Sequence, residues 1–285
     1  MNEKVTTLYD KYKRGSIDRR MFLKELVLTA GGTAAALAIL PVLEKDDLIP
    51  EEFQQDDPDL ITGFITYPGE TGEMKAFQAY PKKGKKFAAV IVIHENRGLV
   101  PHIREVAKRM AKEGFLALAP DALSPLGGTP EDISNVGEMF KKLESEKTTK
   151  NFVAAVKYLK TNPLTTGKVG CTGFCWGGAM TNQVAVNAPE LDAAVPYYGM
   201  QPVEADVARI KAPVMAHYAG NDERINAGIP AFEEALKKYN KEYQIFRYEG
   251  ASHAFNNDSN AERYNPEAAK LAWGRTIGFF KEKLK

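Results

Sequence analysis

The chain of 285 residues is predicted to form one α/β domain over most of its length, with a mostly parallel central sheet and helices on both faces. Continuous apolar, β-branched runs such as "AAVIVI" are typical of strands buried on both faces. Segments with apolar residues at helical spacing follow these runs, and alternation of strand and helix generates a parallel sheet. Two runs of alternating apolar and polar residues come first and predict an antiparallel hairpin.

The elements are predicted in order along the chain. The hairpin is "LITGFITYPGETGEMKAFQAYP", which turns at Gly69-Glu70-Thr71-Gly72. Further strands are predicted in "KKFAAVIVIHENRG", "FLALAPDAL", "GKVGCTGF", "DAAVPYYG", "PVMAHYAG" and "YQIFRYEG". The first predicted helix is "PHIREVAKRMAKEG", which ends at Gly114. Three more helices are predicted, over roughly 130–162, from Gly177 to about Asn187, and over about 266–284.

The N-terminal segment differs in kind from this domain. Arg19 and Arg20 precede a Gly/Ala-rich apolar run from Leu26 to Leu40, which resembles a twin-arginine export signal. The run is shorter than the about 20 apolar residues that a membrane span needs. The alternative is a helix that packs on the domain. It is favoured by Asp18 before the arginines and by an apolar start after the only A-x-A-like site, Ala36-Leu37-Ala38.

These observations divide the chain into three parts. Residues 1–44 are interpreted as the export signal or N-terminal helix, the acidic residues 45–60 as a linker, and residues 61–285 as a single α/β domain. With a functional signal we expect a periplasmic or secreted protein, and otherwise a cytoplasmic one.

Composition excludes several function classes. The formal net charge is +1 and no basic run is arranged to read nucleic acid, so no nucleic-acid partner is expected. The two cysteines, Cys171 and Cys175, lie on a strand and in the turn after it, where a disulfide is geometrically doubtful. No Cys/His zinc spacing occurs, and neither a metal nor a cofactor is expected. The oligomeric state is open, with a monomer as the working expectation.

Cys175 has the most informative local setting. The segment "GFCWG" follows a predicted strand and reads as G-x-S-x-G with cysteine in place of serine. Such a turn presents its central side chain at a helix N-terminus, where the dipole favours a thiolate. The alternative is a small buried hydrophobe, as free cysteines often are.

The strand ends supply partners for a nucleophilic thiol. Asp222 and His253 follow two later predicted strands, so the order Cys175, Asp222, His253 is that of an α/β-hydrolase triad. Glu223 is the rival acid, and His94 remains an alternative base although it precedes the nucleophile. The fold class is therefore specified as an α/β-hydrolase fold.

Residues from about 60 to 285 resemble the dienelactone hydrolase family. The matching segments are "VIVIHENRGL", "AKEGFLALAPDAL", "GKVGCTGFCWGGAM", "HYAGNDERI" and "GASHAF". The resemblance implies Cys175 as nucleophile, His253 as base and then acid, and Asp222 as its partner. It implies that Glu95 interacts with the resting thiol and helps to form the thiolate when substrate arrives. It implies an oxyanion hole from the backbone N–H groups of Trp176 and Asn96.

The chain departs from the dienelactone-specific members, which hold the substrate carboxylate with two arginines. Four residues past His253 this chain has Asn257, and no arginine lies near Ile133. Candidate substitutes are Arg97, Arg224 and Arg263. The resemblance therefore implies hydrolysis of small esters or lactones and does not identify the particular substrate.

Two alternative functions make different demands on the sequence. A papain-like protease expects its histidine 130 residues or more after the cysteine, and His253 is much closer to Cys175. A non-catalytic small-molecule-binding protein on a hydrolase fold is the remaining alternative, because fold does not guarantee activity. A binding module would need none of the three triad residues.

Overall fold

The structure is a computed structural model that describes residues 19–30 and 57–285. Of the described residues, 19–30 belong to a first unit of the chain and 57–285 form a second, compact unit. In the first unit helix α2 spans Arg19–Ala30. The predicted cleavage region and most of the predicted acidic linker lie outside the described residues. Among the described residues, no helix has the length and apolar character needed to span a bilayer.

The second unit is built on an eight-stranded sheet in the order β1-β2-β4-β3-β5-β6-β7-β8. The β1–β2 and β2–β4 pairs are antiparallel and the other pairs are parallel. The predicted hairpin and the mostly parallel sheet are therefore confirmed. The strands are β1 (Leu60–Gly69), β2 (Gly72–Pro81), β3 (Phe87–Ile93), β4 (Leu116–Pro120), β5 (Thr165–Phe174), β6 (Ala193–Tyr197), β7 (Val214–Asn221) and β8 (Tyr243–Ser252).

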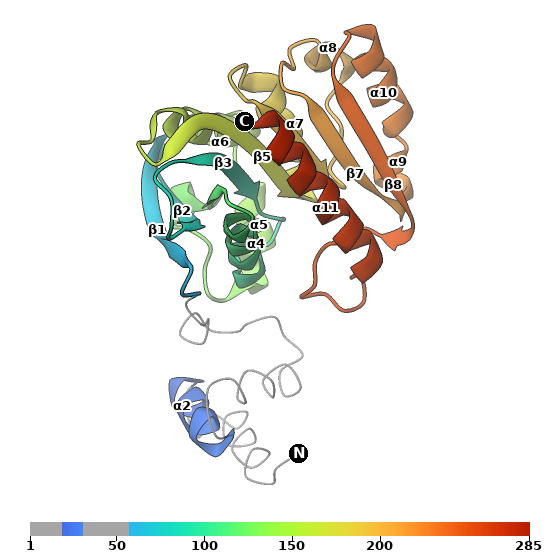
Figure 1. Cartoon of the computed structure of the whole chain (residues 1–285). Coiled ribbons are helices and arrows are strands. Elements are labelled where there is room, and N and C mark those ends of the chain that lie inside the picture. The colour runs from blue at the N-terminus through green and yellow to red at the C-terminus, as the bar shows by residue number, and fades with distance from the viewer. Residues whose placement is uncertain (1–18, 31–56) are drawn as a thin grey trace. The chain divides into compact units, whose positions relative to one another are not determined.

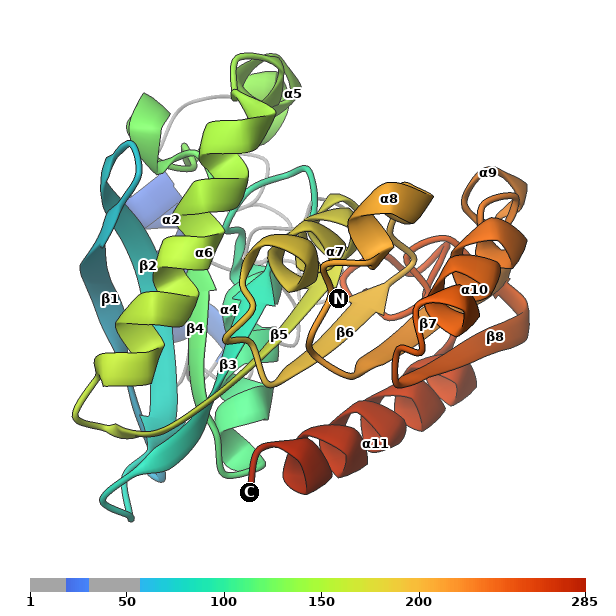
Figure 2. The same cartoon turned by 90° about the horizontal axis from the view of Figure 1, so that it is seen from above.

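Helices cover both faces of the sheet (Figures 1 and 2). One face carries α4 (Pro101–Lys112) and α11 (Pro266–Lys283). The other carries α6 (Ser145–Thr161), α7 (Trp176–Asn187), α8 (Glu204–Val207) and α10 (Ile229–Lys238). The remaining short elements are η2 (Ser124–Leu126), η3 (Ile133–Asn135), α5 (Val136–Lys141) and α9 (Glu223–Asn226).

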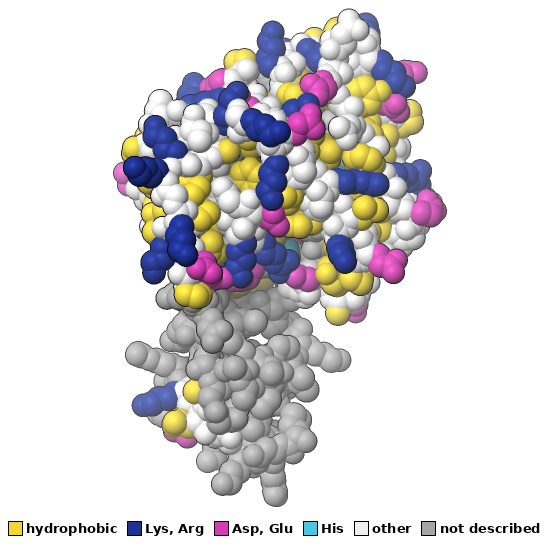
Figure 3. Space-filling model, viewed as in Figure 1, with side chains coloured by type: hydrophobic (Ala, Val, Ile, Leu, Met, Phe, Trp, Pro, Cys, Tyr) yellow, Lys and Arg dark blue, Asp and Glu magenta, His cyan; other side chains and the backbone are white. Residues whose placement is uncertain are grey.

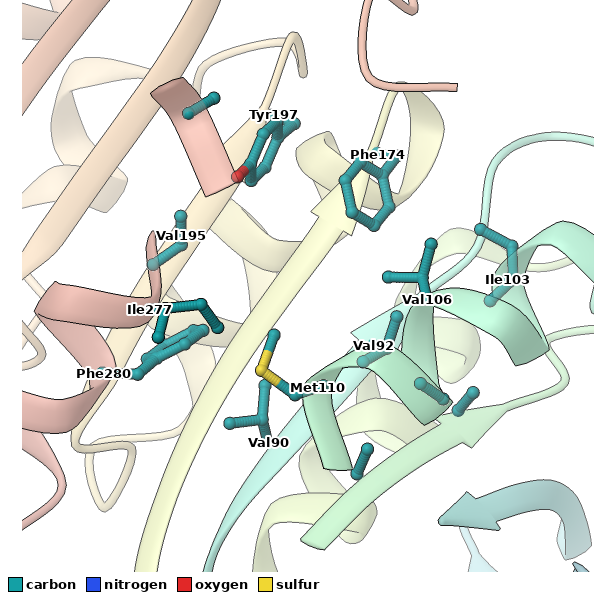
Figure 4. Packing of buried hydrophobic residues seen from close by; sticks show 14 of the residues in the cluster. Val90, Val92, Ile103, Val106, Met110, Phe174, Val195, Tyr197, Ile277 and Phe280 are labelled. Carbon is teal, nitrogen blue, oxygen red and sulfur yellow. The ribbon is translucent and has the colours of Figure 1, made fainter. Parts of the chain in front are cut away.

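Each face of the sheet has its own hydrophobic core, which explains the continuous apolar runs of the central strands. In Figure 4, Met110 of α4 lies beside Val90 of β3, and Ile277 and Phe280 of α11 belong to the same cluster. The second cluster joins the opposite side chains of these strands to α6, α7 and α10. Its larger members include Phe152, Leu159, Met180, Val184, Phe232 and Leu236.

The predicted helix over 130–162 is wrong in its first part. Three elements occupy the range, and the chain breaks before α6 at Glu144, which is extended at φ −78° and ψ 114°. The break leaves Phe140 of α5 edge-on against Trp176, at a ring separation of 5.0 Å. We infer that this tertiary contact outweighs the local preference for one continuous helix.

Charges of both signs are interspersed over the face in Figure 3. Lys281 pairs with Glu113 at 2.8 Å and Arg109 pairs with Asp258 at 2.5 Å. No single sign of charge dominates this face.

Candidate active site

Reactive side chains gather at the carboxyl edge of the sheet. Glu95 lies two residues past β3, Cys175 directly follows β5, Asp222 follows β7 and His253 follows β8. Because these strands are parallel, their carboxyl ends share one edge, where ligands bind in open α/β sheets. Residues far apart in the chain are thus brought to one place.

Cys175 occupies a tight turn between β5 and α7. Its backbone has φ 56° and ψ −112°, a positive φ that is costly for a residue with a Cβ. Its N–H donates to the carbonyl of Tyr197 at 3.1 Å, and its own carbonyl accepts the N–H of Ala179 at 3.1 Å. A Cβ on Gly173 would collide with the carbonyl of Gly177, and one on Gly177 with the carbonyl of His94. The two glycines therefore permit the close packing that this turn requires.

The surroundings of Cys175 favour the neutral thiol. Burial raises the pKa of the thiol, and the negative charge of Glu95 raises it further. The backbone N–H of Trp176 and the charge of Arg224 lower this pKa. The Trp176 contribution has the direction expected at a helix N-terminus, but burial and Glu95 outweigh it. The resting sulfur is therefore protonated at neutral pH.

His253 and Asp222 form a hydrogen-bonded pair. Nδ1 of His253 lies 2.5 Å from Oδ2 of Asp222. The other carboxylate oxygen of Asp222 accepts the N–H of Ile225 at 3.4 Å and caps α9. Asp222 is buried, whereas the neighbouring Glu223 is exposed. The first of the two adjacent carboxylates is thus the one that contacts the imidazole.

The other three histidines are engaged elsewhere. His217 is buried between the Tyr248 hydroxyl, at 2.9 Å, and the Thr276 hydroxyl, at 3.1 Å. His102 pairs with Asp258 at 3.1 Å. Both ring nitrogens of His94 bond to backbone groups, so this side chain has no free nitrogen with which to accept a thiol proton.

Glu95 is held by Asn257. This asparagine occupies the position, four residues past His253, where the dienelactone-specific members have an arginine. Nδ2 of Asn257 donates to Oε2 of Glu95 at 2.9 Å, and both side chains are buried. Oδ1 of Asn257 accepts the N–H of Ser259 at 3.0 Å, which orients the amide. Of the three candidate arginines, Arg224 carries a charge that acts on the Cys175 thiol.

Sequence reasoning did not identify Tyr198 as part of the site. Its ring lies 5.1 Å from that of His253, between centroids, and its backbone has a positive φ of 37°. Its buried hydroxyl has no hydrogen-bond partner of standard geometry in the described part of the chain, although the backbone N–H of Asn256 lies close enough to lower its pKa. Burial, with Glu95 and Cys175 nearby, raises the pKa of this hydroxyl well above its usual value, so it stays protonated. In the sequence, only the position of Tyr198 directly after β6 could have indicated that it lies beside His253.

The described residues bring no three His, Cys, Asp or Glu side chains together as a metal site.

Comparisons with known proteins identify the family of the chain. The model of the dienelactone hydrolase family matches residues 74–284. A Methylorubrum extorquens protein named "Putative carboxymethylenebutenolidase" is 32% identical over 274 residues, which cover 91% of this chain and 92% of that protein. The protein usf of Aquifex pyrophilus is 36% identical over 221 residues, covering 74% and 94% of the two chains. A Klebsiella pneumoniae crystal structure titled "Putative Dienelactone Hydrolase" matches with a TM-score of 0.70 and 29% identity, covering 78% and 98%. The chain therefore belongs to the dienelactone hydrolase family and is a carboxylic ester hydrolase with the α/β-hydrolase fold.

Proposed function

We propose that the protein hydrolyses small esters or lactones through an acyl-cysteine intermediate. The Sγ of Cys175 attacks the carbonyl carbon while His253 takes the thiol proton. The tetrahedral intermediate collapses, the C–O bond to the alcohol breaks, and His253 returns the proton to that oxygen. Water then attacks the thioester with His253 as base, which releases the acid and restores the thiol. The observation that carries this proposal is the bonded His253–Asp222 pair at the same sheet edge as the Cys175 turn.

Asp222 acts through His253 rather than on the substrate. Its bond to Nδ1 supports a tautomer in which Nε2 is free to accept a proton. It also stabilises the imidazolium that forms when the thiol is deprotonated. The second bond, from Ile225, holds the carboxylate in position.

The proposed oxyanion hole consists of the backbone N–H groups of Trp176 and Asn96. Trp176 opens α7, so its N–H has no partner within the helix. It already acts on the neighbouring sulfur, since it lowers the thiol pKa. Asn96 is exposed in the loop after β3, directly beyond Glu95. Two such donors stabilise the charge that develops on the carbonyl oxygen.

Glu95 is proposed to keep the resting enzyme in its thiol form. The carboxylate raises the thiol pKa, which limits oxidation of the sulfur because oxidation follows thiolate character. When substrate displaces Glu95, this repulsion falls and the Cys175–His253 ion pair can form. The amide of Asn257 provides a neutral donor for the carboxylate.

The substrate class follows from the charges around the thiol. Relatives carry the name carboxymethylenebutenolidase. In this chain Asn257 is engaged with Glu95, and the position offers no cation for a substrate carboxylate. We therefore propose small esters and lactones as substrates, with Arg224, whose charge acts on the thiol, as the remaining candidate to hold a substrate carboxylate.

The test uses the two cysteines as a matched pair. Cys175→Ala should abolish turnover of an activated aryl ester such as nitrophenyl acetate. Cys171→Ala, which removes a fully buried thiol beside Thr181, should retain turnover. Wild-type turnover by Cys175→Ala would refute the nucleophile. The alternative, a non-catalytic binding protein, predicts no ester turnover even by the wild-type chain and no selective labelling of Cys175 by a thiol-directed probe.

We also propose that residues 1–44 direct export of the folded domain, which spans 61–285. This proposal depends on the Arg19-Arg20 pair and the Gly/Ala-rich run that follows. Changing both arginines to lysine should retain the protein in the cytoplasm. Equal fractionation of the wild type and the variant would favour the alternative, a helix that packs on the domain.

A further inference from the structure

His94 is a buried histidine with a single compatible tautomer. Its side chain is fully buried, and Nε2 lies 3.0 Å from the backbone nitrogen of Ala122. A backbone N–H can only donate, so Nε2 is the acceptor and Nδ1 carries the proton. Nδ1–H then donates to the carbonyl of Glu95 at 2.6 Å. Burial lowers the pKa of His94, which keeps the ring neutral.

The charge that faces this ring is engaged with other groups. Oδ1 of Asp121 lies 4.0 Å from Nε2. The Asp121 carboxylate accepts the N–H of Leu123 at 3.0 Å and the hydroxyl of Thr129 at 2.8 Å. It does not supply a hydrogen to Nε2, so the tautomer is set by Ala122.

The carbonyl that His94 binds belongs to the same peptide group as the Asn96 N–H. A trans peptide is planar, with its N–H pointing opposite to its C=O, so fixing the Glu95 carbonyl also fixes the direction of the Asn96 N–H. The N–H of Gly98 binds the same carbonyl at 3.3 Å. Hydrogen bonds accepted by a carbonyl also polarise the attached N–H and strengthen it as a donor.

The same imidazole ring packs on the residue that provides the second proposed donor. His94 and Trp176 stack with centroids 5.6 Å apart and planes within 12°. Phe140 packs edge-on against both rings, at 5.9 Å and 5.0 Å. The backbone of His94 also lies against Gly177, where a Cβ would collide with its carbonyl.

We propose that His94 is a positioning residue that holds the Glu95–Asn96 peptide so that the Asn96 N–H points at the developing oxyanion. The donor is the Nδ1–H of the neutral imidazole, and stacking on Trp176 fixes the ring. This inference rests on the oxyanion hole of the proposed function. It also gives a neutral histidine a role in the reaction without proton transfer.

The test compares two amide replacements in the full chain. The Nδ2 of Asn in His94→Asn takes the place of Nδ1 and can donate to the Glu95 carbonyl. His94→Gln places its amide near Nε2, where it can accept from Ala122 but leaves the Glu95 carbonyl without its side-chain donor. Loss of one oxyanion donor lowers kcat by about 10²–10³-fold. For the misdirected donor of His94→Gln we expect kcat on nitrophenyl acetate to fall by about tenfold to a hundredfold, with KM within about threefold.

His94→Asn should recover most of this loss, and the pH profile of Cys175 alkylation should be unchanged in both variants. Equal losses in the two variants, in step with their stability, would overturn the proposal. So would wild-type kcat in His94→Gln.

A second measurement does not depend on the variants folding. In ¹⁵N-histidine-labelled wild-type protein, His94 and His253 should both have a protonated Nδ1 and an unprotonated Nε2, and the His94 signals should be unchanged between pH 5 and 8. The opposite tautomer at His94 would overturn the proposal. Failure of the proposed function has a different signature: Cys175→Ala would keep activity while the His94 tautomer remained as expected. Failure of the His94 role alone would leave Cys175→Ala inactive and His94→Gln fully active.

Discussion

Acidification from pH 7 to pH 5 should destabilise the folded protein through His217. Burial lowers the pKa of this histidine from its usual 6.5 to about 3, and the charge of Arg275 acts in the same direction. The unfolded chain therefore binds a proton that the folded chain excludes. The resulting stability is complete above the unfolded pKa and is lost as pH falls from about 6.5 toward about 3. The slope approaches about 1.4 kcal/mol per pH unit, so the loss at pH 5 is about 2 kcal/mol.

The hydrogen bonds around His217 explain why the ring resists a second proton. Arg275 donates to the Tyr248 hydroxyl at 3.1 Å, so Tyr248 is placed to donate its own hydrogen to Nδ1 of His217 at 2.9 Å. Nε2–H then donates to Thr276 at 3.1 Å. If Nδ1 were protonated, its N–H and the Tyr248 hydroxyl would be two hydrogen donors facing each other. They would also lie beside the positive charge of Arg275, in a site that water does not reach.

Urea unfolding of the full chain at pH 7 and pH 5 measures this effect. His217→Gln should be less stable at pH 7 by about 1–3 kcal/mol, because it leaves the Tyr248 hydroxyl unpaired. Its further loss at pH 5 should be about 2 kcal/mol smaller than that of the wild type. Burial also lowers the pKa of His94, but its contribution to the pH dependence is the same in both proteins and cancels in the comparison.

Tyr197→Phe is the matched control, since it removes a hydroxyl that lies 2.6 Å from Thr276 but leaves both bonds to His217. It should keep the wild-type pH dependence. The reasoning is refuted if His217→Gln loses as much stability between pH 7 and pH 5 as the wild type does.

Four other substitutions test the site. Glu95→Gln should lower the pKa of the Cys175 thiol and speed its alkylation by iodoacetamide at pH 7, because the carboxylate charge adds to burial in raising that pKa; an unchanged pH–rate profile would contradict this. Asp222→Asn should lower kcat by about a hundredfold to ten-thousandfold, whereas exposed Glu223→Gln should stay within about twofold; the reverse order would identify Glu223 as the acid. Tyr198→Phe removes a buried hydroxyl that makes no hydrogen bond of standard geometry in the described segments, so the free energy of unfolding should be unchanged or rise by up to about 1 kcal/mol. A clear loss of stability in urea would mean that the hydroxyl is bonded.

The architecture could be predicted from local patterns. The turn at Gly69–Gly72 joins β1 to β2 as predicted, and the buried apolar runs became the central strands. These predictions succeed because hydrophobic period and turn residues act over a few positions. The prediction of one helix over 130–162 failed because a distant contact decides the structure there. Phe140 packs against Trp176 and His94, which belong to other elements.

By itself the sequence determined the order of reactive residues and their place at strand ends, because chain order and strand direction together put Glu95, Cys175, Asp222 and His253 at one edge. Only the tertiary structure decided which side chains bond there. Two adjacent carboxylates are equivalent in a local pattern, and the turn into α9 directs Asp222 to His253 and leaves Glu223 exposed. The bond between Glu95 and Asn257 joins residues 162 positions apart, and the His94 tautomer depends on a backbone N–H from beyond another strand. Such contacts form only when separate strand ends converge, since hydrogen bonds depend on atomic positions that no local spacing specifies.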